Sequence, residues 1–130
     1  ALILPVHQAV DAAREALRTL TFHSKGATLI MDVGVAGLWR LQARLDEIRT
    51  HRVVIVVAGM DGALVSVLGG LIAAPLIAVP TSTGYGAARG GETALAAALA
   101  SCAPGVLACN IDNGYGAACA AIRILGSGAT

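Results

Sequence analysis

VVIVVAGMDGALVSVLGGLIAAPLIAVPTSTGYGAARG, residues 53–90, is the stretch that decides the fold. It holds two apolar runs, Val53–Ala58 and Pro75–Val79, and each run ends in a loop of small residues. Neither run alternates with polar residues, which is typical of strands covered on both faces, as in a parallel sheet between layers of helices. In such sheets ligands bind at the loops that follow the strands. The sequence therefore predicts an active site at the loops AGMDG and PTSTGYG.

Strands and helices alternate in the rest of the chain as well. We expect a short first strand at 1–4, with Pro5 at the start of a helix that runs to Leu20, because proline suits the first turn of a helix. Further strands are expected at 28–33 and 106–111, and further helices at about 37–50, 62–73, 92–101 and 115–125, followed by a frayed tail at 126–130. This pattern predicts one α/β domain with a doubly wound parallel sheet and right-handed crossovers.

The composition narrows the function classes. The chain has 130 residues, of which 56% are hydrophobic and only 13% charged, so part of its surface is expected to be covered by other subunits in a homo-oligomer. The net charge is +1 without a basic run, which argues against sequence-independent nucleic-acid binding. Pro75, Asp61 and four glycines break the apolar region 53–80 into pieces too short to span a bilayer. With no signal-peptide pattern, the expected location is the cytoplasm.

Two loops carry candidate chemistry. The loop PTSTGYGAARGG is a candidate anion site, because it contains glycines, the hydroxyls of residues 81–83 and the charged side chain of Arg89. The alternative is that it is a structural glycine-rich turn. The spacing fits neither a dinucleotide fingerprint nor a P-loop. Asp61 follows an apolar strand, where its commonest use is to cap a helix. Its alternative use is as a general acid or base in a cleft of low polarity.

The three cysteines form no metal-binding spacing, so no metal site is predicted. Cys109 and Cys119 fall in an expected strand and helix, which suits inert buried thiols. Cys102 lies in the loop ASCAPG, where exposure makes it a candidate nucleophile. Asp112 and Asn113 stand at the end of the last expected strand, where they either cap the next helix or, together with Asn110, bind a ribose or nucleobase.

Five motifs follow one another along the chain: DVGVAG from Asp32, VAGMDGAL from Val57, IAVPTSTGYGA from Ile77, SCAPGV from Ser101 and NIDNGYGA from Asn110. Together they resemble LarB, a family of nickel-pincer nucleotide cofactor biosynthesis proteins with a PurE-like (aminoimidazole ribonucleotide carboxylase) domain. The motifs cover about residues 5–125. The resemblance implies a three-layer, flavodoxin-like PurE fold for residues 1–130 as a single catalytic domain without the family's N-terminal region. It also implies a homo-oligomer, with an octamer as the candidate.

The resemblance further implies a carboxylase. LarB proteins carboxylate the pyridinium ring of nicotinic acid adenine dinucleotide and cleave its phosphoanhydride, which yields pyridinium-3,5-biscarboxylic acid mononucleotide and AMP. Cys102 matches the cysteine that adds to the ring, and Asp61 matches the acidic residue that removes the ring proton. Carbon dioxide is the co-substrate, no tightly bound cofactor is expected, and magnesium is a candidate. The substrate-binding residues implied by the matched motifs are Asp32, Gly34, Gly59, Met60, Thr81, Ser82, Gly84, Tyr85, Gly86, Asn110, Asp112 and Asn113.

The chain departs from the family at two places. LarB proteins usually carry Glu at the position of Asp61, and Ala1-Leu2-Ile3 stands where the family has a Gly-Thr-Ser-Asp type loop. Two alternative functions therefore stay open. One is a PurE-type carboxylase or mutase acting on an aminoimidazole ribonucleotide, which predicts a catalytic histidine that no position here supplies. The other is a non-catalytic nucleotide-binding or assembly domain.

Overall fold

The computed structural model describes residues 1–6, 9–31 and 33–127. They form a five-stranded, all-parallel sheet with the order β2-β1-β3-β4-β5, and helices cover both faces. The strands are β1 (Leu2–Pro5), β2 (Thr28–Leu29), β3 (Val54–Ala58), β4 (Leu76–Pro80) and β5 (Val106–Ala108). The predicted doubly wound α/β class is confirmed.

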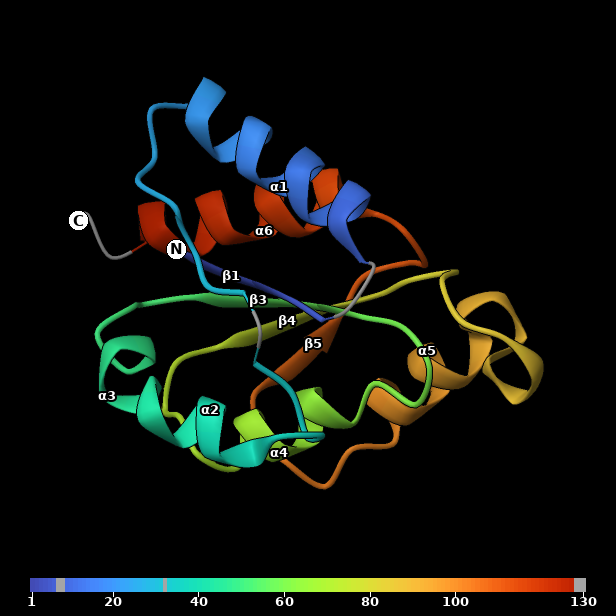
Figure 1. Ribbon diagram of the computed structural model, residues 1–130. Coiled ribbons are helices and arrows are strands. Elements are labelled where there is room, and N and C mark those ends of the chain that lie inside the picture. Colours follow the sequence, from blue (N-terminus) through green and yellow to red (C-terminus); the bar gives the residue numbers. More distant parts are fainter. Residues whose placement is uncertain (7–8, 32, 128–130) are drawn as a thin grey trace.

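The helices lie in two layers (Figure 1). One layer contains α1 (Val10–Phe22) and α6 (Gly114–Ser127), and the other contains α2 (Leu38–Ala43), α3 (Leu45–Ile48), α4 (Ala63–Gly69) and α5 (Glu92–Leu99). A 3₁₀ segment, η1 (Gly86–Gly91), leads into α5. Within the described ranges, no helix is long and apolar enough to cross a bilayer.

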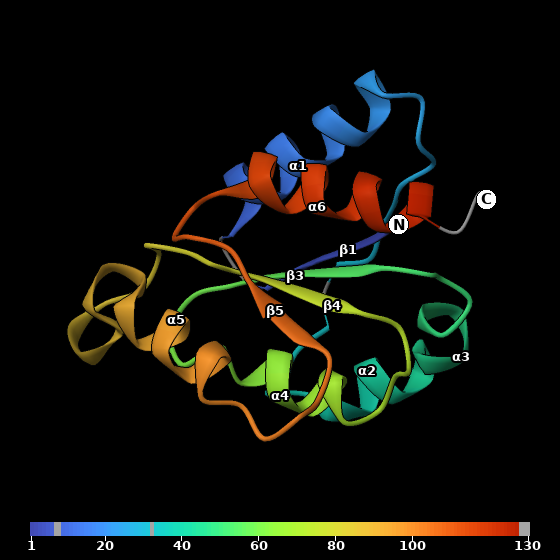
Figure 2. The ribbon, with the colours of Figure 1, turned by 180° about the vertical axis from the view of Figure 1, so that it is seen from behind.

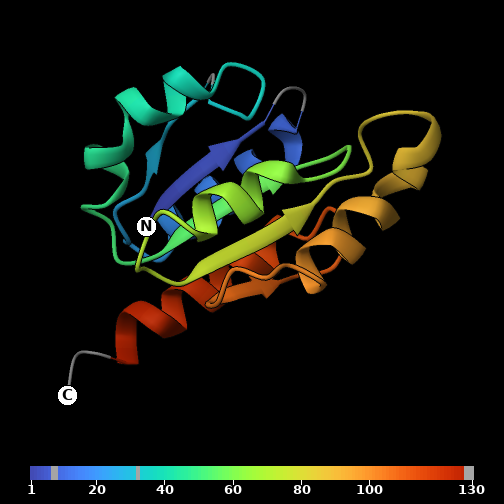
Figure 3. The same ribbon diagram turned by 90° about the horizontal axis from the view of Figure 1, so that it is seen from below.

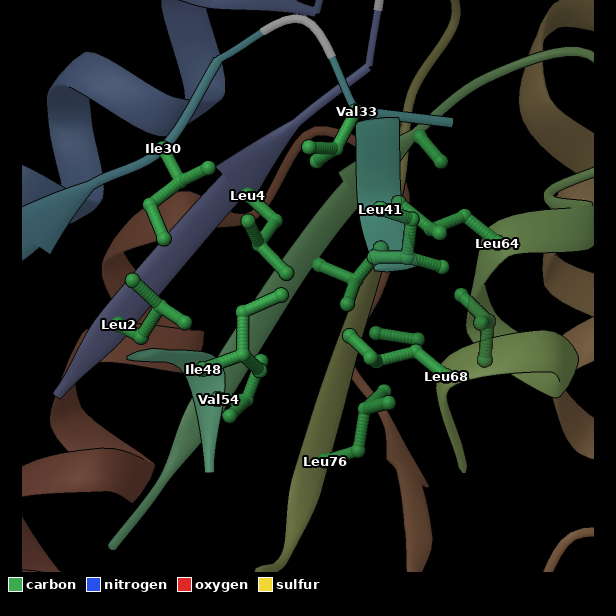
Figure 4. Packing of buried hydrophobic residues seen from close by; sticks show 14 of the residues in the cluster. Leu2, Leu4, Ile30, Val33, Leu41, Ile48, Val54, Leu64, Leu68 and Leu76 are labelled. Carbon is green, nitrogen blue, oxygen red and sulfur yellow. The ribbon is translucent and has the colours of Figure 1, made fainter. Parts of the chain in front are cut away.

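The strands contribute alternate side chains to two separate cores. Leu4, Val56 and Ala78 pack under α2–α5, in the cluster shown in Figure 4, whereas Ile3 and Ile55 pack under α1 and α6. Each central strand is therefore buried on both faces, which explains why the sequence shows continuous apolar runs rather than alternation.

Pro5 is the last residue of β1, so the predicted helix start at this proline is wrong, and α1 begins at Val10. Proline is tolerated in this central strand because of the register. The amides of Leu2 and Val6 donate to β3, so the position of Pro5 faces β2, whose last paired residue is Leu29 opposite Ile3. The missing N–H of the proline therefore costs no ladder hydrogen bond.

Several predicted elements are shorter in the structure. The strand predicted at 28–33 pairs only at Thr28–Leu29, and the one predicted at 106–111 ends at Ala108. The helix predicted to run to Thr50 divides at Arg44, whose backbone is not helical and whose guanidinium bonds Glu47. At the other end of the chain α6 continues to Ser127, so the residues of the predicted tail that the structure describes are helical.

Candidate active site

The carboxyl ends of β1, β3, β4 and β5 meet at one edge of the sheet, because all strands are parallel. Figure 3 shows the arrows of β1, β4 and β5 pointing the same way, toward the gold corner formed by η1. The chain order reverses between β1 and β3, which is the switch point where open α/β sheets bind ligands. The loops predicted to carry the site, after β3 and β4, lie at this edge.

The loops after β3 and β4 are in close contact. A Cβ added to Gly59 would lie 2.6 Å from the carbonyl oxygen of Thr83, so only glycine permits this approach. Thr81 is buried, and its hydroxyl pairs with that of Thr83 at 2.6 Å. These contacts hold the two loops as one unit, with Met60 and Tyr85 on its outer side.

Asp61 borders a cavity of about 380 Å³ beside η1, and Tyr85, 80% exposed, forms another wall. The remaining lining residues are Met60, Gly86, Ala87, Ala88 and Thr93. The Thr93 hydroxyl donates to the carbonyl of Ala87 and so ties α5 to this wall. The lining of the cavity is mainly apolar with one carboxylate, which is typical of small-molecule sites.

The N-cap of α4 is Gly62, so the prediction that Asp61 occupies this position is wrong, although Asp61 still contacts the start of the helix. Its Oδ1 accepts a hydrogen bond from the N–H of Ala63 at 3.2 Å, in the first turn of α4. This bond uses one carboxylate oxygen, and the side chain stays exposed at the cavity. The hydrogen bond to Ala63 therefore holds the carboxylate in place without removing it from solvent.

A second cavity, of about 260 Å³, lies on the other side of the β4 loop, against α1. Asp112 borders it, and both oxygens of its carboxylate accept hydrogen bonds from Ser82. Sequence analysis missed Asp11 and Glu15, which also line this cavity. Because the hydroxyls of the 81–83 loop have partners inside the protein and carboxylates surround this cavity, it is poorly suited to phosphate.

The residues after β5 act mainly as local supports. The Asn113 side chain accepts from the N–H of Gly116 at 2.9 Å, which is the capping role considered for it. Asn110 accepts from the N–H of Ile111 at 2.8 Å. On α1, Glu15 reaches across to accept from the N–H of Tyr115 at 2.7 Å, so these contacts satisfy the start of α6 from two sides.

A third cavity, of about 120 Å³, lies beside the ends of β1 and β2. Gly34 and Arg40 line it, and the guanidinium of Arg40 donates to the carbonyl of Ala36 and lies 5.2 Å from the Trp39 ring centroid. Sequence analysis missed Arg40, although its place in the first turn of a helix after the DVGVAG motif was a usable signal. The predicted site residue Asp32 lies outside the described residues.

Cys102 lies away from all of these residues in the same chain. It follows α5 and precedes β5, and the carbonyl of neighbouring Gly105 accepts from the N–H of Leu76 at the beginning of β4. Figure 2 shows this orange segment passing below α4 before it enters β5. The thiol is exposed at the amino edge of the sheet, whereas Asp61 is at the carboxyl edge. One copy of the chain does not bring Cys102 and Asp61 together.

The other two cysteines differ from Cys102. Burial raises the pKa of the Cys109 thiol above its ordinary value. The side chain of Cys119, one turn after Tyr115 on α6, raises the pKa of the Tyr115 phenol. In the part of the chain that the structure describes, no cluster of His, Cys, Asp and Glu could hold a metal ion.

The chain is 44% identical over 110 residues to an uncharacterized protein of Methanocaldococcus jannaschii, MJ0165. This match covers 83% of the chain but 42% of that protein, so the chain spans less than half the length of its relative. No protein-family model matches the chain. Among solved structures, a variant of Treponema denticola PurE2 superposes with a TM-score of 0.78 at 17% identity, covering 96% of this chain and 78% of that one. The chain therefore has the PurE-like α/β fold.

Proposed function

We propose that this protein is a carboxylase of the LarB type, acting on the pyridinium ring of nicotinic acid adenine dinucleotide and releasing AMP. One observation carries the proposal. Asp61, at the position of the family's proton-abstracting residue, borders a mainly apolar cavity with an exposed aromatic wall, at the sheet edge where this fold class binds ligands. The PurE-like fold supports a carboxylase or mutase scaffold in general.

The proposed reaction uses the two side chains in sequence. The Cys102 thiolate adds to a ring carbon of the pyridinium, which neutralises the ring and makes another ring carbon nucleophilic, like an enamine. That carbon attacks carbon dioxide and forms the new C–C bond. Asp61 then removes the proton from the carboxylated carbon, and the electron pair of that C–H bond restores the aromatic ring as the thiolate leaves. Water cleaves the phosphoanhydride and releases AMP.

This chemistry requires at least two copies of the chain. Asp61 and Cys102 lie at opposite edges of the sheet, so a working site combines Asp61 of one copy with Cys102 of another. The surface beside Cys102 suits such a contact, because Leu99 is 71% exposed and Leu107, on the edge strand β5, is 50% exposed. Contiguous exposed apolar patches often mark subunit interfaces, and in this proposal the two leucines belong to such a patch. The proposal therefore includes a homo-oligomer, with an octamer as the candidate.

The phosphates of the substrate require positive charge, and the cavity beside Asp112 carries carboxylates. Arg40 lines the cavity at the ends of β1 and β2, and Arg89 is exposed on η1. We assign the phosphates to the Arg40 side of the edge. A magnesium ion would accompany these phosphates rather than occupy a dedicated protein site.

The test is product analysis after incubation with nicotinic acid adenine dinucleotide, bicarbonate and magnesium. The proposal expects AMP and a dicarboxylated pyridinium mononucleotide from the wild type, and neither Cys102→Ala nor Asp61→Asn should form the dicarboxylated product. A covalent adduct on Cys102, seen by intact-protein mass spectrometry, should accumulate in Asp61→Asn. Absence of product and adduct in the wild type contradicts the proposal and leaves a nucleotide-binding or assembly domain.

A further inference from the structure

We propose that Ser66, on α4, positions the nucleophilic loop by holding the hydroxyl of Ser101. This inference rests on the proposed role of Cys102 and deepens it. The two hydroxyl oxygens lie 2.8 Å apart, although 35 residues separate them in the sequence. Ser66 is exposed on its helix and lines none of the cavities described above. It therefore acts on the site only through the loop.

Ser101 transmits this contact to the cysteine. Its hydroxyl oxygen also accepts a hydrogen bond from the N–H of Ala103 at 3.2 Å, which closes a turn whose middle residue is Cys102. With Ser66 on one side and Ala103 on the other, the Ser101 hydroxyl has two fixed partners. These two contacts restrain the turn, in which the Cys102 thiol is exposed.

The packing of α4 fits the same role. A Cβ added to Gly69 would lie 2.9 Å from the Cβ of Ala103 and 3.1 Å from Cγ2 of Val106, so the loop rests directly on the helix backbone. At the start of the same helix, Asp61 accepts a hydrogen bond from the N–H of Ala63. A single seven-residue helix thus holds both proposed catalytic groups, Asp61 at one end and the Cys102 loop at the other.

The variants Ser66→Ala and Ser66→Thr distinguish a positioning role from an effect on folding, because they change helix stability and the hydroxyl contact in opposite directions. Alanine favours the helix but removes the hydroxyl, whereas threonine keeps the hydroxyl but is a poorer helix former. We expect Ser66→Ala to lower kcat roughly tenfold with KM unchanged, at a melting temperature no lower than that of wild type. Ser66→Thr should recover most of kcat at a lower melting temperature. Ser127→Ala, which removes a hydroxyl on α6, is the matched control.

A second readout does not depend on turnover. Once the turn is released, the thiol can fold against the apolar surface, so alkylation of Cys102 by iodoacetamide should slow about threefold in Ser66→Ala and recover in Ser66→Thr. Alkylation is followed by peptide-resolved mass spectrometry, with Cys119 as an internal reference whose alkylation rate should not change. If alkylation shifts as expected but the wild type makes no product, the positioning role stands and the proposed function falls. Unchanged Cys102 alkylation in Ser66→Ala, or unchanged kcat in an active protein, overturns the inference.

Discussion

Ser82 donates two hydrogen bonds to the carboxylate of Asp112, one from its N–H to Oδ1 at 2.9 Å and one from its hydroxyl to Oδ2 at 2.6 Å. The two residues follow neighbouring strands, β4 and β5, so this contact sets the relative position of the two loops. Asp112 has a left-handed backbone with φ of 61°, a conformation that asparagine also tolerates.

Asp112→Asn and Asp112→Ala should therefore differ in stability. Asparagine keeps an acceptor and the left-handed backbone, and we expect a loss of about 1 kcal/mol in the free energy of unfolding. Alanine loses both the hydrogen bonds and the backbone preference, for a loss of about 2–3 kcal/mol. Urea denaturation measures both values. Two variants that are both as stable as wild type would show that the Ser82 contact contributes nothing.

Close packing of α1 on α6 depends on Gly114. A Cβ at this position would lie 2.1 Å from the carbonyl oxygen of Ala12, a backbone atom that cannot move by itself. Gly114→Ala should lower the free energy of unfolding by about 3 kcal/mol. Gly126→Ala, in the same helix with open space around it, should raise it by about 0.5 kcal/mol. Urea denaturation measures both variants. A Gly114→Ala protein as stable as wild type would contradict the close contact between Gly114 and Ala12.

Stability should fall in alkaline solution because of Cys109. Burial raises the pKa of this thiol in the folded state. In the unfolded chain the thiol ionises near pH 8.5, so its contribution is fully present below about pH 8.5 and is lost as the pH rises through the folded-state pKa. Unfolding free energies measured from about pH 7 to about pH 10 should fall more steeply for wild type than for Cys109→Ala. If the unfolding free energies of wild type and Cys109→Ala fall in parallel with rising pH, the predicted contribution of Cys109 is wrong.

Asp61→Glu tests the departure from the family at this position. Glutamate is one methylene longer than aspartate, and one oxygen of Asp61 accepts a hydrogen bond from the N–H of Ala63. If the LarB-type reaction is correct, Asp61→Glu should keep activity within about tenfold of wild type, whereas Asp61→Asn should lose the carboxylation step by at least about a hundredfold. Initial rates of product formation measure this. An active Asp61→Asn protein would exclude Asp61 as the base.

The fold was predictable because the strand signal is strong. Val54–Ala58 and Leu76–Pro80 are buried on both faces, and that condition leaves a continuous apolar run in the sequence. Pro5 misled the prediction, because its place in β1 depends on the short length of β2, a tertiary fact that no local pattern carries. The break at Arg44 likewise has no proline or glycine to mark it.

The candidate site was only partly predictable. Asp61 and Tyr85 follow neighbouring strands and meet as expected at one cavity. The resemblance assigns roles to both Asp61 and Cys102 but carries no information on the direction of the strands. A residue before β5 and a residue after β3 lie at opposite edges of a parallel sheet. Glu15 was missed because its contact with Tyr115 joins residues 100 positions apart.

The most direct test of the central claim is to mix two inactive variants, Cys102→Ala and Asp61→Asn, under conditions that exchange subunits, and to measure dicarboxylated product. Each site needs Asp61 from one copy and Cys102 from another, so random assembly of equal amounts should restore about a quarter of wild-type activity. A mixture that stays as inactive as its components, beside an active wild type and with exchange confirmed by mass spectrometry, would contradict a site shared between copies of this chain.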